Sequence, residues 1–176
     1  MMDKLLLTQW CNIILYYLRN MAKFAKKYPL KKNSRSNIIE DKTNKNLYTI
    51  TLNLGKVRSY SKKELVFSKQ HTKNKALWQI LNCFMSEIDE KFKFNSVFIS
   101  KNLKCGWHTD KNNIGLSYGL SLGDHQGGGC IIKDENGDEN ILDYHNYPRQ
   151  FDGHKLHKTL DYNGERFVLI FYTHKW

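Results

Sequence analysis

The sequence is poor in the residues and runs that mark secreted or membrane-spanning proteins. Its 176 residues include only four cysteines and two prolines, and no two cysteines form a C-x-x-C motif. Cysteines this far apart do not build a disulfide framework and are typical of reduced thiols. No uninterrupted apolar run reaches the roughly 20 residues that a membrane-spanning helix needs. We therefore predict an intracellular protein (cytoplasmic, nuclear, or viral within a host cell) with no stable membrane insertion.

The main apolar stretch, residues 5–18, is interrupted by the polar residues Thr8, Gln9 and Asn12. It does not resemble a signal peptide, because Lys4 is the only nearby positive charge ahead of it and no small-residue cleavage site follows. Its large side chains recur at helical spacing, so we predict an amphipathic helix packed on the outside of the core. Binding of this helix to a membrane surface, with the lysines that follow it, is the alternative.

Acidic residues are also scarce, and they are unevenly distributed. The chain has 28 Lys and Arg against 17 Asp and Glu, a net charge of +11. Residues 19–75 contain 16 basic and three acidic residues, whereas residues 76–176 contain 11 basic and 13 acidic residues. A basic segment suits the phosphate backbone of nucleic acid, although a lysine-rich segment is also simply a soluble surface. We predict that residues 19–75 contact nucleic acid.

The pattern along the chain predicts a β domain behind an N-terminal arm. Residues 1–46 contain the predicted helix and a basic arm, and residues 47–176 form the β domain. Residues 47–54 alternate as in a strand, and residues 74–91 carry a helical apolar stripe. Short strands separated by Gly, Asn and Asp turns follow, at residues 96–100, 106–110, 118–122, 129–133, 140–144, 150–151, 156–160 and 166–173. This order predicts a mainly β fold with flanking helices, an antiparallel jelly roll.

A possible metal site combines His108, Asp110 and His157. His108 and Asp110 are two residues apart, so on a strand both side chains point to one face. Two imidazoles and one carboxylate are the facial arrangement that holds a non-haem Fe(II) and leaves positions open for substrate and O₂. The sequence therefore predicts an iron site if His157 lies near the other two residues.

Arg166 adds an anion-binding group to this prediction. Asn163-Gly164 is a strong hairpin signal, and a two- or four-residue loop would place Arg166 opposite Asp161 or Thr159. Opposed residues share a face, so Arg166 would project to the same side as His157 from the neighbouring strand. A dicarboxylate that chelates iron through one end could then place its far carboxylate on the guanidinium. That description fits 2-oxoglutarate.

The order His-x-Asp, a distant His and an Arg nine residues later resembles the Fe(II)/2-oxoglutarate dioxygenases. Neighbouring segments resemble the TET/base-J-binding-protein branch, whose members oxidise the 5-methyl group of pyrimidines in nucleic acid. Those segments are residues 94–102, 108–117, 122–124, 127–129 and 151–153, within a resemblance that covers about residues 92–176. The resemblance implies a double-stranded β-helix (jelly roll, cupin-like), Fe(II) and 2-oxoglutarate as cofactors, O₂ as co-substrate, and hydroxylation of a nucleic-acid base.

The resemblance also implies roles for individual residues. His108, Asp110 and His157 would bind the metal, and Arg166 would bind the far carboxylate of 2-oxoglutarate. His154 is the alternative third ligand, but it stands 12 residues before Arg166, outside the usual family spacing. A further cofactor contact is expected from Thr159. Asn102 and Ser117 are expected to contact the cofactor or to orient a ligand, with a role in turns as the alternative. Substrate contacts are expected from Trp107, Asn112 and Asn113, with core filling as the alternative role of Trp107.

Two other motifs do not carry the chemistry that they imitate. Residues 134–145 look like a calcium loop, but Glu139 stands where a Gly is needed and His145 where a bidentate Glu belongs. We predict a polar hairpin tip there, with its turn at Asn136-Gly137. The run Gly127-Gly-Gly129 lacks the Lys-Ser/Thr of a phosphate loop and instead suits a bulge or a close backbone approach.

Other functions remain compatible with the same residues. The enzyme could hydroxylate a protein side chain or a small molecule instead of a base. Prolyl hydroxylases usually carry Lys where this chain has Arg166, which argues mildly against that class. A catalytically silent binding module could also keep the fold, but such a module need not retain His108, Asp110, His157 and Arg166 together.

Overall fold

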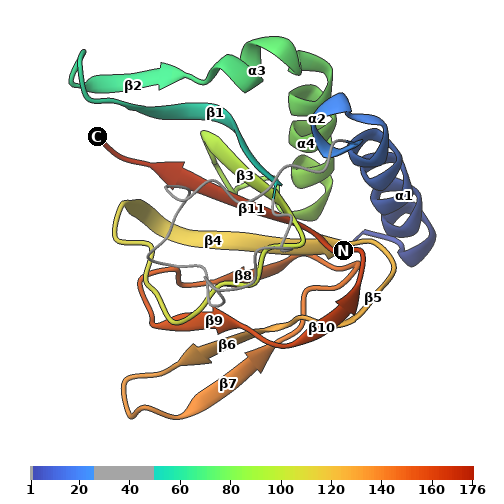
Figure 1. Cartoon of the computed structure of the whole chain (residues 1–176), viewed down its shortest axis with the longest axis vertical. Helices are drawn as coiled ribbons and strands as arrows, with labels where there is room; N and C mark the ends of the chain where they lie inside the picture. The colour runs from blue at the N-terminus through green and yellow to red at the C-terminus, as the bar shows by residue number, and fades with distance from the viewer. Residues whose placement is uncertain (1, 26–49) are drawn as a thin grey trace.

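The structure is a computed structural model that describes residues 2–25 and 50–176 (Figure 1). Its helices are α1 (Lys4–Asn20), α2 (Ala22–Ala25), α3 (Lys69–Lys73) and α4 (Lys75–Ile88). Its strands are β1 (Ile50–Ser59), β2 (Glu64–Phe67), β3 (Ser96–Lys101), β4 (Asn113–Leu122), β5 (His125–Gly127), β6 (Cys130–Lys133), β7 (Glu139–Leu142), β8 (Arg149–Phe151), β9 (His157–Thr159), β10 (Tyr162–Gly164) and β11 (Phe167–His174).

The strands form antiparallel sheets of unequal size. The largest has the order β2-β1-β3-β11-β4-β8, a second has the order β7-β6-β9, and β10 pairs with β5. Strands from distant parts of the chain therefore lie side by side, as in a jelly roll. Figure 1 shows the helices on one side of the large sheet and the smaller strands on the other. The mainly β fold with flanking helices is thus confirmed.

The two faces of the large sheet have different surroundings. Alternate side chains of β3 and β11 point to one face or to the other. Val97, Ile99, Leu169 and Phe171 are completely buried in the main core with the helices. The intervening residues turn to the opposite face, because successive side chains of a strand point to opposite sides. There they line a cavity between the sheets; they are Phe98, Ser100, Val168, Ile170 and Tyr172.

The helices close the outer face of the large sheet. The buried residues of α1 are Leu7, Cys11, Ile14 and Leu18, and those of α4 are Leu77, Leu81, Phe84 and Met85. All eight belong to the same core cluster as the large sheet, so both predicted helices are confirmed as packing elements. Among the described residues, no helix is long and apolar enough to cross a membrane.

Three local predictions are wrong in a way that matters for the site. Asn163-Gly164 does not turn a hairpin: it lies in β10, where Gly164 pairs with His125 of β5. Residues 106–110 form no strand; a single bridge links His108 to His157. β4 begins at Asn113, five residues before the predicted start. The predicted domain boundary at residues 46 and 47, and most of the predicted arm, lie outside the described residues.

The rejected calcium motif is a hairpin tip, as predicted. β6 and β7 pair with each other, and the Asp134 carboxylate accepts hydrogen bonds from the backbone N–H groups of Asn136 and Asp138. Gly137 has a φ of +87° at this turn. The carboxylate that a calcium ion would need is therefore occupied by the chain itself.

Candidate functional site

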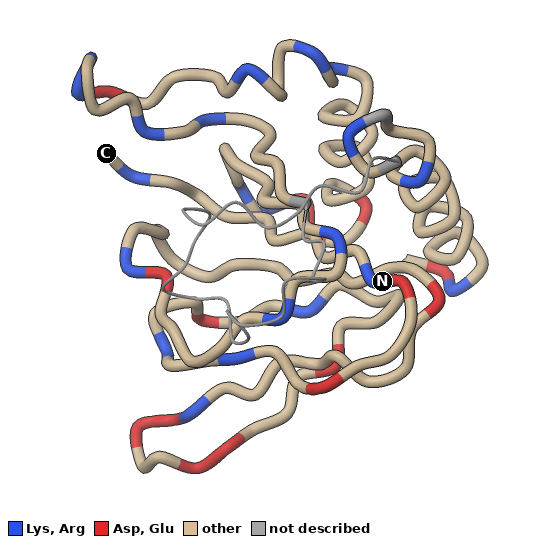
Figure 2. Tube along the Cα trace, viewed as in Figure 1, with Lys and Arg blue, Asp and Glu red and all other residues tan. Residues whose placement is uncertain are grey.

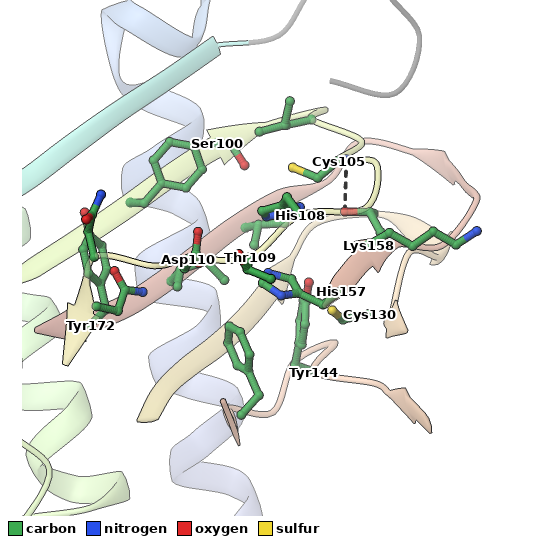
Figure 3. A pocket seen from close by; sticks show the side chains of 18 of the residues that line it. Ser100, Cys105, His108, Thr109, Asp110, Cys130, Tyr144, His157, Lys158 and Tyr172 are labelled. Atoms are coloured by element: carbon green, nitrogen blue, oxygen red, sulfur yellow. Dashed lines mark hydrogen bonds between the residues drawn. The ribbon is translucent and has the colours of Figure 1, made fainter. Parts of the chain in front are cut away.

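A cavity of about 530 Å³ lies between the two sheets. Its walls come from β3 and β11 on one side and from β6, β9 and the segment before β4 on the other. Figure 3 shows side chains from these elements pointing toward one another, with His108, Asp110 and His157 close together. The cavity has the size typical of a small-molecule site.

The three predicted metal ligands meet in this cavity. His108, Asp110 and His157 each offer a ligand atom, and these atoms lie within 4.8 Å of one another. His108 and His157 are joined by two reciprocal backbone hydrogen bonds of 3.0 Å, and their rings lie 4.2 Å apart. This backbone bridge holds the two imidazoles side by side although the residues are far apart in the sequence. His154, the alternative ligand, is exposed and binds Asp152 at 3.0 Å instead.

Both imidazoles are oriented by their own backbone. Nδ1 of His108 lies 2.8 Å from the Gly106 carbonyl oxygen, and Nδ1 of His157 lies 2.7 Å from the Lys155 carbonyl oxygen. A carbonyl oxygen only accepts, so in the neutral form of each ring Nδ1 carries the proton and Nε2 offers the lone pair. This second-atom hydrogen bond is the usual device that orients metal-binding histidines.

Asp110 is fixed by the turn that follows it and by the loop before β9. Its backbone N–H donates to the Gly153 carbonyl oxygen at 2.8 Å, and its carbonyl oxygen accepts from the Asn113 N–H at 3.2 Å. A Cβ at Gly153 would stand 3.3 Å from the Asp110 Cβ. The small residue therefore lets the loop pass directly behind the carboxylate.

Burial keeps the distal imidazole ready to bind a cation. His157 is 5% exposed, and this burial lowers its pKa below the usual value despite the hydrogen bond to Lys155. A lower pKa favours the neutral ring, and only the neutral ring offers a lone pair for coordination. His157 is therefore neutral at physiological pH.

Arg166 lines the same cavity, but its side chain projects from a different sheet than predicted. It stands just before β11 and has the same parity as Val168 and Ile170, which line the cavity. His157 and Thr159 face the cavity from β9, which belongs to the other sheet. Arg166 and His157 therefore face one cavity from opposite sheets, not from neighbouring strands, because the predicted hairpin between them does not form.

The Arg166 guanidinium is buried without an acidic partner. It is 1% exposed, and its hydrogen bonds go to the Gly128 carbonyl oxygen at 2.6 Å, the Leu103 carbonyl oxygen at 3.4 Å and the Tyr144 hydroxyl at 3.2 Å. Its Nε has no hydrogen-bond partner, and no described carboxylate forms an ion pair with it. A buried cation is costly unless it is paired, so the unpaired charge of this group suits an anion.

The residues behind the guanidinium add no negative charge. His125 is 7% exposed, and burial, followed by the neighbouring His145 and Arg166, lowers its pKa to about 4. Its ring centre lies 3.9 Å from that of His145, and the two rings are tilted by 30°. The neutral His125 imidazole therefore adds no negative charge to compensate the Arg166 guanidinium from this side.

Gly128 makes room for this guanidinium. Its φ is +82°, and a Cβ there would lie 2.6 Å from Arg166 Nε. We expect Gly128→Ala to destabilise the protein by about 2–5 kcal/mol, because it adds a left-handed backbone cost of ~1–2 kcal/mol and overpacks a buried group at a cost of ~1–3 kcal/mol. Urea unfolding followed by circular dichroism measures this loss.

Gly137→Ala is the matched control for that substitution. Gly137 has a φ of +87°, but a Cβ there would meet nothing within 4 Å. The control carries the backbone cost alone, so it should lose clearly less stability than Gly128→Ala. Equal losses in the two variants would show that Gly128 does not pack against Arg166.

Two hydroxyl groups accompany Arg166 in the cavity. Thr159, a predicted cofactor contact, is 8% exposed and its Oγ1 accepts from the Cys105 N–H at 3.2 Å. Tyr144 is 5% exposed, and burial raises its pKa to about 12, so its hydroxyl stays protonated. The sequence places Tyr144 at the end of a predicted strand but gives no signal that its side chain enters the site, so this residue was missed. Cys105, Cys130 and His174 also line the cavity and were missed.

The other predicted site residues divide into two groups. Asn112 and Asn113 line the cavity, and their contact with substrate stays a prediction. Asn102 and Ser117 do not: Asn102 accepts from the Arg166 backbone N–H at 3.0 Å, and Ser117 accepts from the Asn113 side chain at 3.4 Å. They hold two residues of the cavity lining, Arg166 and Asn113, from behind, and their contact with the cofactor stays a prediction.

Trp107 also lies outside the cavity lining, in contrast to its predicted place in the substrate pocket. Its side chain is 36% exposed, with the ammonium groups of Lys133 and Lys158 at 4.7 and 5.0 Å from the ring centre. Core filling, which was its alternative role, does not describe this exposed position, and its contact with substrate stays a prediction.

Comparison with solved structures places this fold among known oxygenases. A Pseudomonas putida prolyl-4-hydroxylase is similar at a TM-score of 0.56 and 13% identity over 96% of this chain and 88% of that chain. A 2OG-Fe(II) oxygenase family member from Burkholderia pseudomallei is similar at 0.52 and 15% over 70% and 67%. NgTET1 in complex with 5mC DNA is similar at 0.61 and 11% over 99% and 69%. The chain folds as a double-stranded β-helix.

Sequence comparison adds nothing to this result. No protein-family model matches the chain, and no curated protein matches it significantly. Identities of 11% to 15% show the shared fold alone, because one fold hosts many functions. The function must therefore be argued from the residues in the cavity.

Proposed function

We propose that this protein is an Fe(II)/2-oxoglutarate-dependent oxygenase. The buried Arg166 guanidinium carries the proposal, because it has no described acidic partner and lines the cavity that contains His108, Asp110 and His157. Such a cation needs an anion, and a metal held by three facial ligands needs further ligands from outside the protein. 2-Oxoglutarate meets both needs, since one end chelates a metal and the other is a carboxylate.

Each residue of the cavity has a distinct role in this proposal. His108, Asp110 and His157 would hold the metal, the two imidazoles through Nε2. Arg166 would bind the far carboxylate, and the protonated Tyr144 hydroxyl beside it would donate a further hydrogen bond. Thr159 lines the same cavity. Its Oγ1 accepts from the Cys105 N–H, so its hydroxyl proton remains for a hydrogen bond to the ligand. The residues present therefore fit both groups.

The chain prepares the cavity for oxidative chemistry. Bound Fe(II) would supply the activation of O₂ that is coupled to decarboxylation of 2-oxoglutarate. The backbone carbonyl groups of Gly106 and Lys155 hold the imidazoles in one orientation, so coordination needs no rearrangement. Phe151, Val168 and Ile170 add apolar walls, which limit water near the reacting atoms.

For the substrate, we propose a base in nucleic acid, of the 5-methylpyrimidine type. The basic first half of the chain supports this choice, since residues 19–75 hold 16 of the 28 basic residues. The fold similarity to NgTET1 in complex with 5mC DNA is compatible with it. A base in a duplex would first have to be flipped out, at a cost of a few kcal/mol.

Hydroxylation of a protein side chain is the second candidate. The similarity to the prolyl-4-hydroxylase from Pseudomonas putida favours it and covers 88% of that chain. The same metal and Arg166 sites would serve either substrate, because they bind the cofactors and not the target. The two candidates therefore differ only at the mouth of the cavity.

Turnover assays with defined substrates distinguish these candidates. The protein would be incubated with Fe(II), 2-oxoglutarate and O₂, together with methylated single-stranded DNA, methylated RNA or a proline-containing peptide, and succinate would be measured. We expect a methylated nucleic acid to stimulate succinate formation, and mass spectrometry to find one added oxygen on the base. Stimulation by the peptide alone would remove the nucleic-acid proposal. No succinate with any of them, despite bound metal, would remove the oxygenase proposal.

A further inference from the structure

A basic and aromatic surface lies beside the mouth of the cavity. We call it the rim: Arg58, Tyr60, Lys62, Lys63, Lys111, Lys175 and Trp176. It combines the turn of the β1–β2 hairpin, the C-terminal residues and the segment before β4. Figure 2 shows basic segments at the hairpin and next to the C-terminus. Hydrogen bonds connect the rim to residues that line the cavity.

Two hydrogen bonds connect the rim to the cavity. The Lys175 backbone N–H donates to the carbonyl oxygen of Asn112, which lines the cavity, at 3.2 Å. Arg58 Nε donates to the Lys175 carbonyl oxygen at 3.0 Å. Lys111 lines the cavity itself and is exposed. A chain bound along the rim would therefore pass the entrance of the cavity.

Two large aromatic side chains of the rim are exposed to solvent. Tyr60 is 78% exposed and Trp176 is 50% exposed. Their ring centres lie 6.2 Å apart and the rings are tilted by 58°, so they touch without covering each other's faces. Exposed aromatic rings flanked by cations are a stacking platform for unpaired bases.

The charge of the rim is unbalanced. None of its five Lys and Arg residues forms an ion pair with a described acid. The same imbalance extends along the hairpin, α3 and the first residue of α4, because Glu64 is the only acid between residues 50 and 75, a range that also contains Lys56, Lys69, Lys73 and Lys75. A polyanion that also presents flat apolar rings is the partner that matches both properties.

We propose that the rim binds single-stranded nucleic acid, with phosphates on its Lys and Arg side chains and bases on Tyr60 and Trp176. This proposal adds a binding surface to the proposed function. It rests on that function for the step in which the bound base is hydroxylated. Only an unpaired base exposes the face that these rings need, and only an unpaired base can enter the cavity. A duplex would offer its backbone but not its base faces.

Binding is tested without metal or 2-oxoglutarate, so the result does not depend on catalysis. Fluorescence anisotropy of a labelled oligothymidine with the full chain in EDTA measures affinity over a range of salt concentrations. We expect the double variant Tyr60→Ala/Trp176→Ala to bind at least about tenfold more weakly, since each stacked base contributes strongly. In Lys62→Ala/Lys63→Ala, the slope of log affinity against log salt should become shallower by about 0.7 for each phosphate that is no longer neutralised.

Matched controls use residues of the same kind away from the rim. Tyr16 is 71% exposed on α1, and Lys91 is exposed after α4. Tyr16→Ala and Lys91→Ala should bind within about twofold of the unchanged protein. Equal affinity of the rim variants and the controls would overturn the proposal, as would binding of polyglutamate as tight as that of oligothymidine. Rim-dependent binding without turnover would contradict the proposed reaction but not the surface.

Discussion

Replacing His108 with alanine should abolish tight metal binding while the fold is kept. Loss of a group that only orients a metal ligand typically costs about 10–100-fold in affinity, so loss of a ligand should cost more than about 100-fold. The bridge to His157 survives because its two hydrogen bonds use backbone atoms. Titration with Mn²⁺, followed by electron paramagnetic resonance, measures the affinity. Circular dichroism on heating checks the fold, and the turnover assay should show no succinate.

His154→Ala is the control for this substitution. His154 was the alternative ligand in the sequence, but it is exposed and binds Asp152. The control should bind Mn²⁺ as the unchanged protein does. Strong loss in His154→Ala together with little loss in His108→Ala would overturn the assignment of the metal site to His108, Asp110 and His157.

Replacing Arg166 with methionine should separate cofactor binding from metal binding. Methionine fills part of the space with an apolar chain but offers no charge to a carboxylate. Removal of one partner of a buried charge pair costs about 2–5 kcal/mol, so 2-oxoglutarate should bind at least about 30-fold more weakly. Mn²⁺ should bind as before, because Arg166 is not a ligand. Calorimetric titration of 2-oxoglutarate into the Mn²⁺-loaded protein measures the difference.

Thermal stability gives an independent measurement of the same effect. A ligand that binds only the folded state raises the unfolding temperature by an amount that grows with its affinity, so 2-oxoglutarate should stabilise the unchanged protein but not Arg166→Met. Arg149→Met is the control, since Arg149 is exposed on β8 and lies over the Tyr147 ring. If Arg166→Met still gains stability from 2-oxoglutarate as the control does, the anion site lies elsewhere.

Local periodicity was a reliable guide to elements and faces. The apolar stripes of α1 and α4 depend only on neighbours three and four residues away, and both helices pack by those stripes. The alternation of β11 likewise separates the buried Phe167, Leu169 and Phe171 from the cavity-facing residues. These properties are local because a helix or strand repeats within a few residues.

Strand partners could not be predicted in the same way. The hairpin expected at Asn163-Gly164 is absent because β10 pairs with β5 and β11 pairs with β3 and β4. Pairing depends on which distant strand completes the hydrogen bonds, and turn residues are only one contribution to that choice. Arg166 still reaches the cavity, because its parity with the residues of β11 directs it there from the opposite sheet.

The sequence by itself determined the chemical groups of the site: two imidazoles, one carboxylate and one guanidinium at spacings that fit a metal and a dicarboxylate. Only the tertiary structure decided how they meet, through the His108–His157 bridge and the two facing sheets. It also supplied Tyr144 and excluded Trp107, Asn102 and Ser117 from the cavity lining. The physical reason is that composition and spacing are properties of the chain, whereas burial and proximity arise from long-range packing.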